Sequence, residues 1–213
     1  MKSSRLFRFL WCGQLISNLG TQASLYGIGL WLFARSGQLL DFGLVAMVVQ
    51  AARLLALPIF LRLFSSWRPG RLMVLCHATG AICTAMLAVL LLGSPAGVSP
   101  PLIGILVIQG LAAMAEAMLV VRLSSLIPRL ISDQELLRRA NGLFASVDGL
   151  VIAMAPFLGS WVIASNGLLG AFLIDGVSFL LALVSVVVAP WPQDLRRIDY
   201  EAYDEKNRLF SSR

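Results

Sequence analysis

The sequence predicts an all-α membrane protein with six transmembrane helices and with both ends in the cytoplasm. Of its 213 residues, 58% are hydrophobic and only 13% are charged, which is about half the charged share of a soluble domain. A soluble fold of this size has too little interior for so much apolar surface, whereas a lipid bilayer accommodates it. The positive charges also gather between long apolar runs, where they orient a membrane protein.

Six apolar runs reach the length of about 20 residues that a helix needs to cross a bilayer. They are residues 9–33, 42–61, 72–93, 101–123, 140–164 and 168–189. The first run is longer than the apolar region of a cleaved signal peptide, so we expect it to remain as a membrane anchor. Together the runs predict one membrane domain, residues 1–190, followed by a cytoplasmic tail, residues 191–213.

The connections between these runs alternate in charge. Basic residues lie before the first run and after the second, fourth and sixth; they include Lys2, Arg5, Arg8, Arg62, Arg68, Arg71, Arg129, Arg138, Arg139, Arg196, Arg197, Lys206, Arg208 and Arg213. Residues 94–100 and 165–167 carry no charge. Because basic connections stay in the cytoplasm, we expect both termini and the second and fourth connections there. The tail mixes both signs and is expected to be a short surface helix or a disordered end.

Several functional classes are disfavoured by what the sequence contains. Cys12, Cys76 and Cys83 form no C-x-x-C pair and are interpreted as small apolar residues, not as metal ligands or disulfide partners. A single histidine, without a plausible nucleophile–base pair or a Walker loop, argues against an enzyme. The basic connections account for the net charge of +6. We therefore expect no catalysis, cofactor, metal or nucleic-acid partner, and a lipid bilayer as the surroundings.

Three segments carry a resemblance to a known family. They are RLFRFLWCGQLISNLG at residues 5–20, IPRLISDQELLRRANG at residues 127–142 and IDGVSFL at residues 174–180. With them the sequence resembles the N-terminal half of a major facilitator superfamily transporter, in the bacterial exporter branch that includes macrolide-efflux and enterobactin-export proteins. The segments are similar, in order, to that branch's first helix, its loop between helices four and five, and the start of its sixth helix.

This resemblance implies a bundle of two three-helix repeats in the bacterial cytoplasmic (inner) membrane. In the family, two such halves face each other across a central cavity, and this chain would supply one half. Helices one and four of the family line the cavity, and helices two and five line the contact between halves. The implied partner is a second copy of the chain, another six-helix half or a larger membrane complex. The sequence also fits a fragment of a full-length transporter.

The sequence departs from the family pattern at a few positions. Leu61 stands for a Gly, and residues 65–66 are Ser-Ser in place of Asp-Arg, in the loop between helices two and three. That acidic residue belongs to a charge network that helps gate family transporters. Arg53 stands where the branch usually has Pro. In residues 155–160, which are similar to the family's antiporter motif, Ala155 and Ser160 replace two glycines.

Three ionisable residues lie deep within the apolar runs. Arg53 is nine residues from Arg62, or about 13 Å along a helix axis, close to the middle of a ~30 Å hydrocarbon core. Glu116 and Asp148 are also far from the run ends. A charge at this depth persists when it is paired or faces a cavity or a partner. Two interpretations stay open: Arg53 and Asp148 contact a partner, or Arg53 pairs with Glu116 inside the bundle.

These considerations select two sets of candidate site residues. The candidates for a substrate cavity are Gln14, Asn18, Gln22 and Tyr26 of the first run and Gln109 and Glu116 of the fourth. The candidates for a partner interface are Arg53, Asp148, Gly149, Pro156 and Gly159. Ordinary hydrogen bonding between helices is the competing interpretation of the polar residues, and a helix kink competes with a mobile hinge at the proline. The small residues of the fifth run favour close helix packing.

Two functions follow from these patterns. The first is a half-length transporter that pairs with a partner half and exports a small molecule; the resemblance implies an amphipathic or siderophore-like substrate. The second is an accessory or scaffold subunit of a larger membrane complex, derived from a transporter half but not itself transporting. A second six-helix unit that co-purifies with the chain favours the first function, and an unrelated large complex favours the second.

Overall fold

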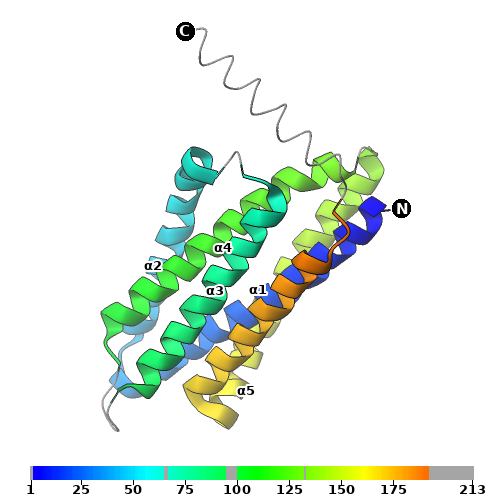
Figure 1. Ribbon diagram of the computed structural model, residues 1–213. Coiled ribbons are helices and arrows are strands. Elements are labelled where there is room, and N and C mark those ends of the chain that lie inside the picture. Colours follow the sequence, from blue (N-terminus) through cyan, green and yellow to red (C-terminus); the bar gives the residue numbers. More distant parts are fainter. Residues whose placement is uncertain (1, 65–66, 95–99, 132, 192–213) are drawn as a thin grey trace.

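The computed structural model describes residues 2–64, 67–94, 100–131 and 133–191. All regular secondary structure in these ranges is helical (Figure 1). The elements are α1 (Lys2–Ser36), α2 (Leu39–Ile59), the short π-helix η1 (Phe60–Phe64), α3 (Pro69–Leu92), α4 (Leu102–Leu130) and α5 (Gln134–Val188). The predicted runs all fall within these helices or at their ends. The predicted tail beyond Trp191, and most of the connection 94–100, lie outside the described residues.

Four helices in the described ranges are long and apolar enough to cross a membrane, as a multi-pass membrane protein requires. They are α2 together with η1, α3, α4 and α5. The predicted first span lies within α1, which does not belong to this group. Its polar side chains, among them Gln14, Asn18 and Gln22, interrupt the apolar residues and lower its mean hydropathy.

Helix α5 consists of two arms that meet at Gly167. This glycine has φ 63° and ψ −168°, a combination that residues with a Cβ atom rarely adopt. We call residues 134–166 the first arm and residues 168–188 the second arm. The runs 140–164 and 168–189, predicted as separate spans, correspond to these two arms. Figure 1 shows the chain turning back between them, at the yellow end of the bundle.

Helix α1 packs against both arms, and the neighbours along its length give their directions. Asn18 contacts Asp148 of the first arm, and further along α1 Gly27 lies against Ile163. The first arm therefore runs parallel to α1. On the second arm the order is reversed, because Gly13 lies against Ser185, and Gly20 against Ser178. The second arm therefore runs antiparallel to α1 and to the first arm.

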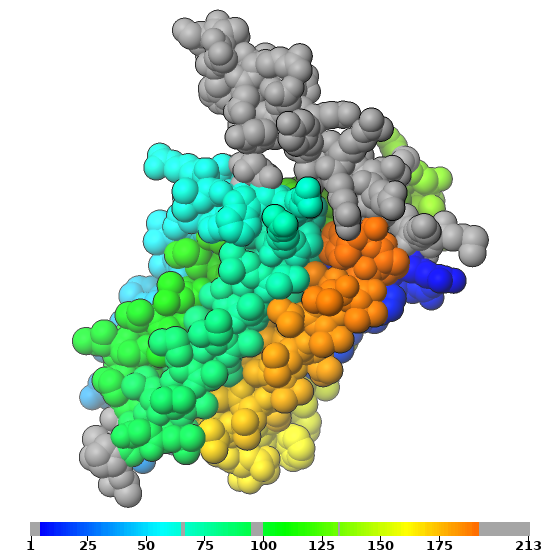
Figure 2. All heavy atoms as spheres, in the orientation of Figure 1, coloured from blue at the N-terminus to red at the C-terminus, as the bar shows by residue number. Residues whose placement is uncertain are grey.

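The remaining helices complete the bundle. Helix α3 lies beside the second arm, where Gly80 leaves room for the ring of Phe179, and Figure 2 shows these two elements side by side on one face. Helix α4 packs against α2 and α3. Trp191, predicted as the first residue of the tail, packs its ring against Gly70 of α3 and donates a hydrogen bond from Nε1 to the carbonyl oxygen of Val186 at 2.9 Å.

The apolar core is divided between the two ends of the bundle. One cluster, near the N-terminus, includes Leu6, Leu72 and Leu126. The other, near the connection between α1 and α2, includes Ile28 and Ile105. In α1 and α2, the polar and charged side chains of the candidate site lie between the buried residues that enter these two clusters. The fold therefore places a polar layer at mid-height, inside an otherwise apolar bundle.

Candidate functional site

A cavity of about 480 Å³ opens at this polar layer. It is bounded by α1, α2, α4 and the first arm of α5. Its lining residues are Asn18, Gln22, Arg53, Glu116, Ala117, Val120, Val121, Asp148, Val151 and Ile152. The polar and charged residues of this set were all predicted from the sequence as cavity or partner-interface candidates. The structure brings Asn18, Gln22 and Glu116 of the first set and Arg53 and Asp148 of the second together in one site, which we call the mid-bundle cavity.

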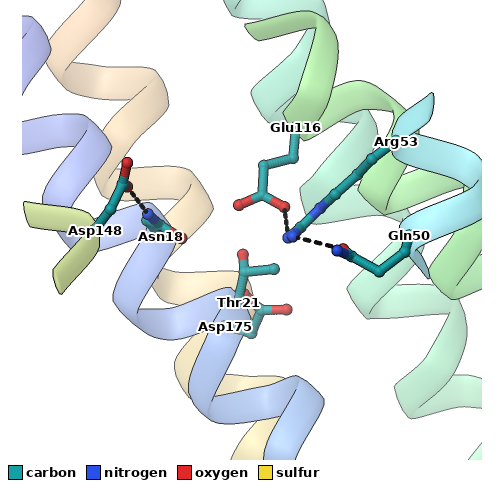
Figure 3. A network of polar contacts seen from close by, with 7 residues as sticks. All are labelled: Asn18, Thr21, Gln50, Arg53, Glu116, Asp148 and Asp175. Atoms are coloured by element: carbon teal, nitrogen blue, oxygen red, sulfur yellow. Dashed lines mark hydrogen bonds and ion pairs between the residues drawn. The ribbon is translucent and has the colours of Figure 1, made fainter. Parts of the chain in front are cut away.

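Arg53 reaches Glu116 across the boundary between α2 and α4. Its Nη2 atom lies 2.7 Å from Oε2 of Glu116, and the two side chains are 30% and 9% exposed. Its Nη1 atom donates a second hydrogen bond, of 3.1 Å, to Oε1 of Gln50 (Figure 3). Short charge-assisted bonds of this kind are stronger than bonds between neutral groups. The internal Arg53–Glu116 pair, one of the two interpretations of the sequence, is thus formed in the structure.

Gln50 was not among the residues predicted from the sequence. It lies three residues before Arg53, so that both side chains project from one face of α2. Helical spacing between two polar residues in an apolar run was the signal that could have identified it. The apolar walls of the cavity were also missed, because valine and isoleucine in a membrane helix are indistinguishable by type from lipid-facing residues.

Asp148 of the first arm lies on the other side of the site from Arg53 (Figure 3). Its Oδ1 atom accepts a hydrogen bond of 3.1 Å from Nδ2 of Asn18 on α1. Among the described residues, no basic side chain lies within ion-pair distance of Asp148. Since Arg53 already pairs with Glu116, the described lining of the cavity holds one more carboxylate than cations.

A second polar cluster, centred on Asp175, joins three elements. Asp175 of the second arm is 5% exposed. Its Oδ1 atom accepts a hydrogen bond of 3.0 Å from Thr21 of α1, and its Oδ2 atom accepts one of 3.1 Å from Thr84 of α3. These two hydrogen bonds link α1, α3 and the second arm inside the core. Asp175 thus stabilises the packing of the three elements.

The other cavity candidates occupy different places. Tyr26 and Gln22 line a smaller cavity of about 170 Å³ between α1 and α2, next to Phe42. Gln14 and Gln109 are buried in the bundle and line neither of these two cavities. Among the described residues, Oε1 of Gln14 has no hydrogen-bond partner.

The remaining partner-interface candidates differ in their exposure. Gly149 is exposed, with open space beside its Cα atom, and Pro156 is half-buried. Gly159, in contrast, is buried inside the bundle: a Cβ atom at this position would lie 2.5 Å from the carbonyl oxygen of Ala23. The backbones of the first arm and α1 are in close contact at this position. Gly159 therefore packs against α1 and does not lie on an outer face of the bundle.

The described residues hold no cluster of three or more histidine, cysteine or acidic side chains able to bind a metal ion. Of the cysteines, Cys76 and Cys83 are buried and Cys12 is exposed, all with free thiols. Charged and amide groups are available to orient a ligand, and aliphatic walls are available to bury it.

Comparison with known proteins identifies one family. The model of the Major Facilitator Superfamily matches residues 4–208, which is nearly the whole chain. No curated protein and no solved structure matches the sequence significantly.

Proposed function

Since this chain belongs to the Major Facilitator Superfamily, we propose that it acts as half of a transporter that exports a small molecule across the bacterial cytoplasmic (inner) membrane. The superfamily is a family of membrane transporters, and the long apolar helices agree with that membership. The mid-bundle cavity carries the proposal. It is lined by α1, α2, α4 and the first arm, and their counterparts in the family, helices one, two, four and five, line the transport cavity and the contact between halves.

The open side of the mid-bundle cavity supports a partner. Asp148 is exposed and Arg53 is partly exposed at mid-height in the isolated bundle. A charged side chain at the centre of a membrane helix costs about 2.5–3.5 kcal/mol on insertion scales. A second six-helix unit, supplied by another copy of the chain or by a different protein, would cover these groups and enclose the cavity. A larger membrane complex would cover them in the same manner.

We propose six membrane crossings with both termini in the cytoplasm. Support comes from the reversal at Gly167 and from the basic connections. Figure 1 shows the N-terminus, η1 and the start of α5 at one end of the bundle, and Arg62 and Arg138 lie in or next to these segments. Positive charges on one side of the membrane orient a multi-pass protein.

This topology is tested with reporter domains fused at single positions. Fusions at Gly97 and Asn166 are expected to report the exterior, and fusions at Pro69, Ser132 and Phe210 the cytoplasm. Alkaline phosphatase and a fluorescent protein form a suitable pair, because each is active on only one side. Reports of the same side from Gly97 and Pro69 would contradict the six-crossing arrangement.

Export is tested in bacterial cells that lack their main efflux pumps. Cells are loaded with fluorescent amphipathic compounds of both charge signs, and efflux is followed after energisation. We expect the chain to speed the efflux of at least one compound. Ile152→Trp is the matched variant: Ile152 is 67% exposed and lines the cavity, so a larger side chain there obstructs the cavity with little effect on the core. It is expected to abolish the added efflux at equal protein abundance.

The second candidate function is an accessory subunit that does not transport. The observation that favours it is the altered loop between the second and third spans, where Leu61 and Ser65–Ser66 stand for the family's Gly and Asp-Arg. This function predicts no efflux of any compound, together with co-purification of an unrelated large membrane complex. If the chain causes efflux and Ile152→Trp abolishes that efflux, the accessory-subunit function is excluded.

A further inference from the structure

We propose that the mid-bundle cavity binds an amphipathic organic cation and that Asp148 is the residue that selects its charge. This inference rests on the proposed transport function and names the class of its substrate. It depends on which charges in the cavity are already compensated, on the apolar character of the walls and on the size of the space.

Arg53 is occupied by partners within the bundle. Nη2 donates to Glu116 at 2.7 Å, and Nη1 donates to Gln50 at 3.1 Å. The Glu116 side chain is only 9% exposed, and its negative charge lies against the guanidinium of Arg53, which is 30% exposed. A ligand therefore meets this pair as a nearly neutral unit, and an anion would have to compete with Glu116 to reach Arg53.

Asp148 is in the opposite situation. Asn18 donates one hydrogen bond to Oδ1 and so orients the carboxylate, but a neutral amide does not compensate its charge. The side chain is exposed and lines the cavity. In surroundings of low dielectric constant, an uncompensated carboxylate attracts a cation much more strongly than it does in water.

The rest of the cavity favours an apolar body attached to that cation. Val120, Val121, Val151 and Ile152 line it. A volume of about 480 Å³ lies within the range of small-molecule sites, ~300–1,000 Å³. A lipophilic cation satisfies both features, because its charge lies against Asp148 while its apolar groups contact the aliphatic walls.

The test compares two probes of the same shape and opposite charge, tetraphenylphosphonium and tetraphenylborate. Binding to the full chain in nanodiscs is measured by equilibrium dialysis. We expect tetraphenylphosphonium to bind more tightly, and Asp148→Asn to weaken its binding about tenfold, as loss of a near charge contact predicts. Asp41→Asn makes the same chemical change in the first turn of α2, away from the cavity, and is expected to leave binding unchanged.

Two results would overturn the proposal: tighter binding of tetraphenylborate, or equal cation affinities in Asp148→Asn and Asp41→Asn. Native mass spectrometry of the same samples addresses the competing role of Asp148. If Asp148→Asn reduces association with a partner but leaves cation binding intact, the carboxylate belongs to a subunit contact and the proposal fails. Cation binding that depends on Asp148 without any efflux from cells would refute the transport function while leaving this site in place.

Discussion

Replacing Arg53 by leucine is expected to lower the free energy of unfolding of the isolated protein by about 3 kcal/mol, because loss of one member of a buried ion pair leaves the other uncompensated. The side chain left behind is Glu116, which is 9% exposed and accepts its bond from Arg53 at 2.7 Å. Unfolding of the purified chain in mild detergent, followed by circular dichroism against denaturant, measures the change. The value lies at the lower end of the usual range since Arg53 is itself partly exposed.

Two further variants separate the pair from general damage at this position. Arg53→Leu combined with Glu116→Gln removes both charges and is expected to recover most of the lost stability, which a double-mutant cycle quantifies. Arg53→Lys is expected to recover only part, because an ammonium group lacks the planar fork with which Arg53 reaches Gln50 and Glu116 together. Unchanged unfolding in Arg53→Leu with poorer recovery of a partner protein would show that the charge serves a subunit contact instead.

The second large effect is expected at Gly159, where alanine should destabilise the bundle by about 2 kcal/mol through overpacking. The added Cβ atom would meet backbone, namely the carbonyl oxygen of Ala23 at 2.5 Å and the nitrogen of Gly27 at 3.2 Å. Backbone atoms cannot rotate aside as a side chain can, so α1 and the first arm must separate. Thermal unfolding of the purified protein is the measurement.

Gly149→Ala is the matched control for this substitution. Gly149 lies ten residues earlier on the same arm, and apart from the backbone of its own helix turns no atom lies within 4 Å of a Cβ built there. Alanine is the better helix former by roughly 0.5–1 kcal/mol, so this variant is expected to be as stable as the original protein or slightly more stable. If both substitutions have the same effect, the close approach of α1 and the first arm at Gly159 is not as the structure describes it.

The positions of the helices could be predicted from the sequence because they depend on local properties. About 20 apolar residues in lipid must satisfy their backbone hydrogen bonds within the segment, and a helix does this. For that reason the predicted runs fall within the observed helices, including α1, whose polar residues lower its hydropathy. The separation of the fifth and sixth runs was likewise visible in the uncharged residues 165–167, although the left-handed backbone of Gly167 was not.

The composition of the site could be predicted only in part. Charged and amide residues deep in apolar runs are rare enough to be noticed singly, and Asn18, Gln22, Arg53, Glu116 and Asp148 all line the mid-bundle cavity. Gln14 and Gln109 have the same residue types and similar depth, yet they are buried elsewhere. The depth of a residue along a helix can be predicted from the sequence. The direction in which its side chain points depends on how the neighbouring helices pack against that helix.

Hydropathy and charge depend on neighbouring residues, so the helical character, the membrane location and the few buried charges of this protein could be predicted from the sequence. How those charges combine depends on the tertiary structure. Arg53 and Glu116 are separated by 63 residues, and Asn18 and Asp148 by 130. Whether Arg53 meets Glu116 or faces outward depends on how α2 and α4 are rotated against each other. That rotation is set by packing across the whole bundle, and it leaves Asp148 without a charged partner among the described residues.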